Sequence, residues 1–143
     1  MAAVWRPCCK RVLIIEDEEI LAENIAYYLE TGGAEVLVAH TGEQALLHLG
    51  HFAPQCVIAD FNLPGVNGIE TMRRIREQFP QTFCILITGQ GSESVYVAAR
   101  ASGVDHILIK PFALPDLGSC LCTHQRAEAL GGAGSGSELL ARA

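Results

Sequence analysis

The sequence lacks the long apolar segments and the basic charge that mark membrane and nucleic-acid-binding proteins. No apolar run approaches the ~20 residues needed to cross a bilayer, and residues 1–10 lack the long apolar core of a signal peptide. The 10 Lys and Arg residues are outnumbered by 16 Asp and Glu residues, which gives a net charge of −6. Because nucleic-acid binding requires a basic footprint, we expect neither a nucleic-acid interface nor a membrane partner.

The cysteines lack the spacing of a structural zinc site. There are six of them: Cys8, Cys9, Cys56, Cys84, Cys120 and Cys122. No two pairs follow the Cys-x-x-Cys pattern that typically holds zinc. Cys56 and Cys84 lie in apolar runs, where cysteine behaves as a small buried hydrophobic residue. We therefore expect a reduced, cytoplasmic protein.

The chain does contain enough apolar material for one folded domain. Half of its 143 residues are hydrophobic and 18% are charged, which is typical of a globular chain. We divide the sequence into an N-terminal extension (1–10), a folded domain (11–127) and a C-terminal tail (128–143). The tail includes a Gly/Ser/Ala-rich stretch from Gly131 to Ser137 that has the composition of a flexible linker.

Apolar runs alternate with helix-like patterns five times along the folded domain. The predicted strands cover residues 11–15, 35–40, 56–60, 83–88 and 106–109. Capping pairs mark two helix starts, Thr41 with Gln44 and Asn67 with Glu70. Three arginines are expected on the solvated face of the helix after Asn67: Arg73, Arg74 and Arg76. The alternation predicts an α/β fold with right-handed crossovers, in which helices cover both faces of a parallel sheet.

Chemically active residues follow four of the predicted strands. They are Glu16 and Asp17, Asp60, Thr88 with Gly89, and Lys110. The carboxyl ends of parallel strands lie at one edge of a sheet, so we expect these residues to converge. An isolated Asp60 would be interpreted as a turn-initiating residue. Its neighbours at the other strand ends instead favour a phosphoryl-transfer site.

Three carboxylates at close range repel one another unless a cation neutralises them. Lys110 can supply one positive charge, and Mg²⁺ can supply the rest, since it binds a few carboxylates and keeps several waters. In that setting Asp60 can act as a nucleophile toward phosphorus. The Thr88 hydroxyl and the Gly89 N–H can donate hydrogen bonds to the oxygens of the transferred group.

Four motifs, in order and with compatible spacing, resemble the receiver domain of two-component response regulators: VLIIEDEE, VIADFNLPGVNG, ILITG and HILIKPF. The resemblance covers Arg11 to about Arg126. It implies a flavodoxin-like, doubly wound, five-stranded parallel sheet of order 2-1-3-4-5. It also implies a phosphorylation-dependent signalling switch of a histidine-to-aspartate phosphorelay, with no enzymatic activity beyond accepting the phosphoryl group and losing it again.

The resemblance assigns a role to each residue of the metal site. Asp60 resembles the phosphoacceptor, and it would share a Mg²⁺ ion with Asp17 as a direct ligand. Glu16, in place of the more usual Asp, would act on the metal through water. Asn62 would contribute its backbone carbonyl.

The same resemblance identifies the residues that contact the phosphoryl group. Thr88 and Lys110 resemble the pair that senses and neutralises it, and Gly89 would bind it through its N–H. Pro111 stands at a position that is often a cis-proline in the family.

Three positions set this sequence apart or are variable in the family. Ile107 stands where the family usually has a Tyr or Phe that swings inward with the threonine, so we expect Thr88 and Ile107 to switch through shape and apolar packing. Asn62 and Gln90 lie two residues after the phosphoacceptor and the threonine. We predict that both tune hydrolysis of the acyl phosphate by positioning or blocking water.

The implied partners are a sensor histidine kinase or phosphotransfer protein and an unknown downstream effector, with a homodimer through the fourth helix–fifth strand–fifth helix face. One alternative is a receiver-like interaction module that works unphosphorylated, which the Ile107 departure keeps open. An aspartyl-phosphate hydrolase is disfavoured because such enzymes carry a second Asp where this chain has Asn62. A flavin or nucleotide binder is disfavoured because neither a Walker loop nor a dinucleotide fingerprint is present.

Overall fold

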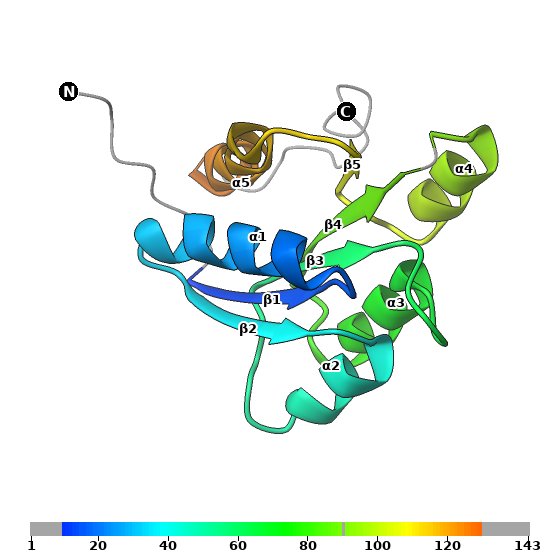
Figure 1. The fold of residues 1–143 in the computed structure, drawn as a ribbon, viewed down its shortest axis with the longest axis horizontal. Helices are drawn as coiled ribbons and strands as arrows, with labels where there is room; N and C mark the ends of the chain where they lie inside the picture. The colour runs from blue at the N-terminus through cyan, green and yellow to red at the C-terminus, as the bar shows by residue number, and fades with distance from the viewer. Residues whose placement is uncertain (1–9, 90, 130–143) are drawn as a thin grey trace.

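The computed structural model of the chain describes residues 10–89 and 91–129, so Gln90 and the predicted linker from Gly131 to Ser137 lie outside the described residues. Strands and helices alternate as predicted (Figure 1). The strands are β1 (Arg11–Ile15), β2 (Glu35–Ala39), β3 (Cys56–Asp60), β4 (Phe83–Thr88) and β5 (His106–Ile109). The helices are α1 (Glu19–Thr31), α2 (Gly42–His48), α3 (Gly68–Gln78), α4 (Glu93–Ala101) and α5 (Leu114–Ala129). None of the described helices is both long and apolar enough to cross a membrane.

The five strands form one parallel sheet in the order β2-β1-β3-β4-β5. This confirms the predicted flavodoxin-like topology. In register, Ile15 pairs with Ala59, Asp60 with Ile87, and Thr88 with Ile109. Four neighbouring strands therefore end at nearly the same level, namely β1, β3, β4 and β5. This places the residues that follow them at one edge of the sheet.

Helices cover both faces of the sheet (Figure 1). Alternate strand residues pack against different helices. One set of side chains packs with α1 and α5: Val12, Ile14, Cys56, Ile58, Ile85 and Ile87. The other set packs with α2, α3 and α4: Leu13, Ile15, Val57, Ala59, Cys84 and Leu86. A strand buried on both faces has no polar face, which explains why β1, β3 and β4 are continuous apolar runs. The expected burial of Cys56 and Cys84 is confirmed, and both are free thiols.

Side-chain caps hold the starts of α2 and α3 as the sequence predicted. The Thr41 hydroxyl oxygen accepts a hydrogen bond from the Gln44 N–H at 3.0 Å, and the Gln44 side chain accepts one from the His40 N–H at 2.9 Å. The Asn67 side chain accepts a hydrogen bond from the Glu70 N–H at 2.9 Å. These caps satisfy backbone donors that have no partner inside the helix.

The three arginines of α3 divide into two kinds. Arg73 and Arg74 lie on the solvated face as predicted and bind Glu70 at 2.6 and 2.9 Å. Arg76 does not belong to that face. It donates to the carbonyl oxygens of Thr82 and Gly103 and pairs with Asp105 at 2.7 Å. Its guanidinium therefore joins α3 to the start of β4 and to the turn between α4 and β5.

The first residue of α3 touches the backbone of Asp60. A Cβ atom added to Gly68 would overlap the Asp60 carbonyl oxygen and lie 3.2 Å from a methyl group of Leu86. The Gly68 N–H also donates to the Phe61 carbonyl oxygen at 3.2 Å. The turn from β3 to α3 is thus closed by a contact that requires the absence of a side chain, and this contact holds the carboxyl end of β3.

We predict that Gly68→Ala lowers the free energy of unfolding by about 2–4 kcal/mol, because the new methyl group must displace the backbone of Asp60. Urea unfolding followed by circular dichroism measures the change. Gly50→Ala is the matched control, since Gly50 is exposed and a Cβ there meets nothing within 4 Å. Equal midpoints for the two variants would contradict the tight contact.

Candidate functional site

The edge formed by the carboxyl ends of the strands brings four predicted residues together. Glu16 and Asp17 follow β1, Asp60 ends β3 and Lys110 follows β5. The Lys110 Nζ lies 2.7 Å from Asp60 Oδ2 and 3.3 Å from Glu16 Oε1. One carboxylate oxygen from each of Glu16, Asp17 and Asp60 can lie within 4.8 Å of the others. Residues that are up to 94 positions apart in sequence thus form one charged cluster.

Asp60 is held from two sides. Its Oδ2 accepts the hydrogen bond from Lys110, and its Oδ1 accepts one from the Asn62 N–H at 2.9 Å. Only 4% of Asp60 is exposed, so the carboxylate lies at the floor of the site and not on its rim. Its position on a central strand, flanked by β1 and β4, gives it a rigid support.

Glu16 is a buried acid that the surrounding residues do not fully satisfy. It is 1% exposed, and its Oε1 has no hydrogen-bond partner among the described residues, although the Lys110 ammonium is near. Burial raises the pKa of Glu16 to about 7. The hydrogen bond from the Glu18 N–H opposes the rise and the charge of Asp60 adds to it. The ionised carboxylate is therefore costly in this position unless a further cation neutralises it.

Lys110 is the cation that the described part of the chain supplies to this cluster. Burial lowers the pKa of its ammonium, but the hydrogen bond to Asp60 and the charges of Asp60 and Glu16 outweigh that effect and raise the pKa. Lysine is therefore protonated across the physiological range. Its backbone is fixed as well, since the Lys110 N–H donates to the Thr88 carbonyl oxygen at 2.8 Å. The Lys110–Pro111 peptide bond is cis, as expected.

The donor set of the cluster fits a hard divalent cation. Glu16, Asp17 and Asp60 offer only carboxylate oxygens, which suit Mg²⁺ or Ca²⁺ and not zinc. The partnerless Oε1 of Glu16 and the local excess of negative charge over one lysine are what a bound cation would resolve. The residues present therefore fit a metal ion, with Asp17, exposed at the rim, as its most accessible ligand.

The other predicted residues occupy the rim and walls of this edge. Thr88 is fully buried at the end of β4, and the exposed Gly89 follows it with open space where a side chain would begin. Asn62 is exposed beside Asp60. Ile107 is 5% exposed and belongs to the same apolar cluster as residues of α4. Gln90, the second predicted tuning residue, lies outside the described residues.

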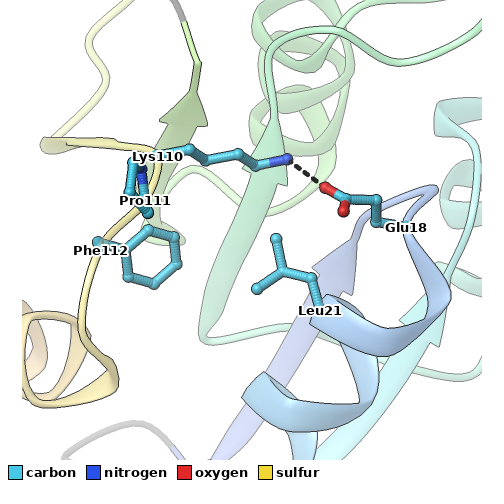
Figure 2. Close-up of a pocket in the computed structure, with 5 residues that line it drawn as sticks. All are labelled: Glu18, Leu21, Lys110, Pro111 and Phe112. Atoms are coloured by element: carbon cyan, nitrogen blue, oxygen red, sulfur yellow. Dashed lines mark hydrogen bonds and ion pairs between the residues drawn. The ribbon is translucent and has the colours of Figure 1, made fainter.

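Two residues of this edge were not identified from the sequence. Glu18 is 67% exposed in its side chain, and its Oε1 lies 3.2 Å from the Lys110 Nζ. Figure 2 shows these two charged groups facing each other. His40 follows β2, and its Nδ1 lies 3.0 Å from the carbonyl oxygen of Glu16. The run of four acids from Glu16 to Glu19 indicated that an acid could lie near Lys110. The sequence alone does not show which of these acids reaches the lysine.

Comparisons with known proteins agree with this geometry. A sequence model described as the response regulator receiver domain matches residues 12–121. The chain is 39% identical over 110 residues to the phosphate regulon transcriptional regulatory protein PhoB of Rhizobium meliloti, a match that covers 75% of this chain and 48% of PhoB. It is 35% identical over 107 residues to the transcriptional regulatory protein TrcR of Mycobacterium tuberculosis, covering 75% and 42%. The chain spans about half the length of these curated relatives.

Solved structures show the same fold. A response regulator from Burkholderia pseudomallei, determined with a phosphorylated aspartic acid, a calcium ion and citrate, has a TM-score of 0.73 and 28% identity over 85% of this chain and 74% of its own. A CheY-like receiver domain protein from Methanospirillum hungatei has a TM-score of 0.77 and 25% identity over 87% and 98%. The family model, the relatives and the carboxylate–lysine edge all agree, and the chain belongs to the receiver domain family of two-component response regulators.

Proposed function

We propose that Asp60 is the phosphoacceptor of this receiver domain and that Mg²⁺ bound by Glu16, Asp17 and Asp60 is required for phosphoryl transfer to it. The observation that carries this proposal is the 2.7 Å contact between the Lys110 ammonium and Asp60, beside three carboxylates that can share an ion. The backbone carbonyl of Asn62 is the fourth proposed ligand. A carboxylate with a fixed ammonium on one oxygen is both oriented and partly neutralised for attack on an anionic donor.

In the proposed step a carboxylate oxygen of Asp60 forms a bond to phosphorus while the bond from phosphorus to the donor's leaving group breaks. The electron pair of that bond leaves with the imidazole nitrogen of a phosphohistidine or with the acetate of acetyl phosphate. Lys110, the Thr88 hydroxyl and the Gly89 N–H bind the oxygens of the transferred group. A bound Mg²⁺ supplies further neutralisation of the charge on those oxygens. Water later hydrolyses the acyl phosphate and restores Asp60.

The solved relative from Burkholderia pseudomallei supports the acceptor role, since that protein was determined with a phosphorylated aspartic acid together with a calcium ion. The physiological donor we propose is a sensor histidine kinase or phosphotransfer protein of the cytoplasm. PhoB and TrcR are named as transcriptional regulatory proteins, which supports a DNA-binding downstream effector. We infer that this domain regulates the effector and that its own acidic surface does not bind DNA.

The proposed output surface consists of α4, β5 and α5, through which the domain would also form a homodimer. Val97 of α4 is 60% exposed, which leaves an apolar side chain available on this surface. Ile107 lies beneath α4 in the same cluster as Val95 and Ala99. A shift of Thr88 toward the phosphoryl group would change the space beside Ile107, so we infer that α4 responds through apolar packing rather than through rotation of an aromatic ring.

A second candidate function is an interaction module that does not require phosphorylation. The buried Ile107 favours it, because the described structure offers no aromatic side chain at this position to couple the site to α4. The two functions differ in whether the phosphoryl adduct changes the protein.

We predict that the chain gains the mass of one phosphoryl group when it is incubated with acetyl phosphate and Mg²⁺, as detected by intact mass spectrometry. Asp60→Asn abolishes the adduct because it removes the nucleophile, whereas Asp116→Asn, an exposed carboxylate on α5, leaves it unchanged. EDTA slows adduct formation by about tenfold or more. A wild-type chain that gains no adduct, or an adduct that persists in Asp60→Asn, would contradict the acceptor role.

We also predict that Asn62→Ala combined with Gln90→Ala changes the rate of dephosphorylation by about threefold or more, since these side chains position or block the attacking water. The decay of the adduct after removal of donor, followed by mass spectrometry, gives the rate. Asn24→Ala, on the exposed side of α1, is the control. An unchanged decay rate in the double variant would show that neither side chain tunes hydrolysis.

A further inference from the structure

Three carboxylates surround the Lys110 ammonium, and they differ in how they are placed. Asp60 Oδ2 lies 2.7 Å from Nζ, Glu18 Oε1 lies 3.2 Å away and Glu16 Oε1 lies 3.3 Å away. The side chains of Glu16 and Asp60 are 1% and 5% exposed, whereas that of Glu18 is 67% exposed. An ammonium group has three N–H donors, so these three acids can take all of them, with the hydrogen bond to Glu16 going to its Oε2 at 3.5 Å. Glu18 takes the one that faces solvent.

Glu18 differs from Glu16 and Asp60 because we assign it no role in binding the metal ion or the phosphoryl group. Within the described part of the chain, the carboxylates close enough to share an ion are Glu16, Asp17 and Asp60, and Glu18 is not among them. Asp60 is the proposed phosphoacceptor, and Glu16 is a proposed metal ligand. Glu18 is therefore the acid that stays free to bind Lys110 when the site is loaded.

Lys110 has room to leave the site if nothing holds it. A pocket of about 380 Å³ opens beside its side chain, lined by Glu18, Leu21, Lys110, Pro111 and Phe112. Figure 2 shows the carboxylate of Glu18 and the ammonium of Lys110 pointing toward each other, with Leu21 and Phe112 lining the space next to them. A lysine has four methylene groups and large rotamer freedom, so a partner at the rim limits where the ammonium goes.

The position of Glu18 in the fold indicates that its side chain serves the lysine and not the helix. Glu18 is the N-cap residue of α1, with φ −78° and ψ 107°, and its carbonyl oxygen accepts the first helical hydrogen bond, from the Ala22 N–H at 3.0 Å. Its side chain makes no capping hydrogen bond to the described backbone. Ser, Thr, Asp and Asn cap helices far better than glutamate does. The long side chain instead reaches Lys110, while the Glu18 N–H holds Glu16 Oε2 at 3.1 Å.

We propose that Glu18 is a positioning residue that keeps the Lys110 ammonium at the phosphoacceptor by binding it from the solvent side. This inference rests on the proposed function of Asp60. It deepens that function, because it makes Glu18, the N-cap residue of α1, responsible for placing Lys110, the residue that neutralises the transferred phosphoryl group. Loss of Glu18 lets the ammonium sample the adjoining pocket, so the fraction of molecules with a correctly placed lysine falls.

The first test compares the rate of adduct formation with saturating acetyl phosphate and Mg²⁺ in Glu18→Gln, Glu18→Ser and Glu19→Gln. Glu19 is the matched control, because it is an exposed acid one residue later and its substitution by Gln removes the same charge. We expect adduct formation to slow by about threefold in both Glu18 variants and to stay unchanged in Glu19→Gln. Equal rates in Glu18→Gln and Glu19→Gln would overturn the proposal.

The second test needs neither metal nor phosphodonor. Urea midpoints of Glu18→Gln, Lys110→Met and the double variant form a double-mutant cycle. We expect the stability change of the double variant to differ from the sum of the two single changes. In the control cycle, the changes caused by Glu19→Gln and Lys110→Met should add. Glu18→Ser should unfold at the same or a higher urea concentration than wild type, since serine caps α1, although phosphorylation slows. Additive Glu18 and Lys110 shifts, or slower phosphorylation accompanied by lower stability in Glu18→Ser, would point to a merely structural role and overturn the proposal.

A third measurement separates positioning from metal binding. Glu18→Gln and Glu19→Gln should weaken Mg²⁺ binding to the same small extent, because each removes one nearby charge. A selective loss of Mg²⁺ affinity in Glu18→Gln would make Glu18 a metal ligand and overturn the positioning role.

A wild-type chain that takes up no phosphoryl group contradicts the proposed function itself. A wild type that does so, with Glu18→Gln behaving as Glu19→Gln, contradicts only the role of Glu18.

Discussion

The contact between the Lys110 ammonium and the Asp60 carboxylate is the interaction on which the site depends. Four acids lie at this edge, namely Glu16, Asp17, Glu18 and Asp60, and Lys110 is bonded to three of them. Carboxylates at such distances repel one another, and the raised pKa of Glu16 expresses that cost together with the cost of burial. Lys110 alone therefore does not balance the negative charge at this edge. The proposed Mg²⁺ would neutralise part of it, and the proposed phosphoryl group on Asp60 would change it again.

The sheet and the turn after β3 hold the charged residues of this edge in place. Asp60 sits on a strand with neighbours on both sides, and the turn after it is closed by the contact between Gly68 and the Asp60 backbone. At the opposite end of α3, Arg76 ties the helix to the turn before β5. The core thus holds Asp60 in place, while α4 buries Val95 and Ala99 against that core, with Tyr96 partly buried beside them. A rigid support for the proposed phosphoacceptor and a covering helix that can shift are what the proposed phosphorylation switch requires.

The sequence allowed most of the site to be predicted because its residues stand where strands end. The apolar runs of β1, β3 and β5 stop at Glu16, Asp60 and Lys110, and parallel topology then places these residues at one edge whatever the details of packing. Prediction was less successful for residues whose role depends on side-chain direction. Arg76 looked like Arg73 and Arg74 in the sequence, yet it turns toward the carbonyl oxygens of Thr82 and Gly103. Glu18 could not be distinguished from Glu19 for the same reason.

By itself the sequence determined the order of strands and helices, the two capped helix starts and the set of acids, threonine and lysine at the carboxyl edge, because these follow from local periodicity and from where apolar runs stop. Only the tertiary structure decided which oxygen faces which nitrogen. It placed Glu18 on the outer side of Lys110, left an oxygen of the buried Glu16 without a hydrogen bond among the described residues, and pressed Gly68 against Asp60. These contacts join residues far apart in the chain, and their distances depend on how α1, α3 and the turn after β5 pack on the sheet, which no local pattern encodes.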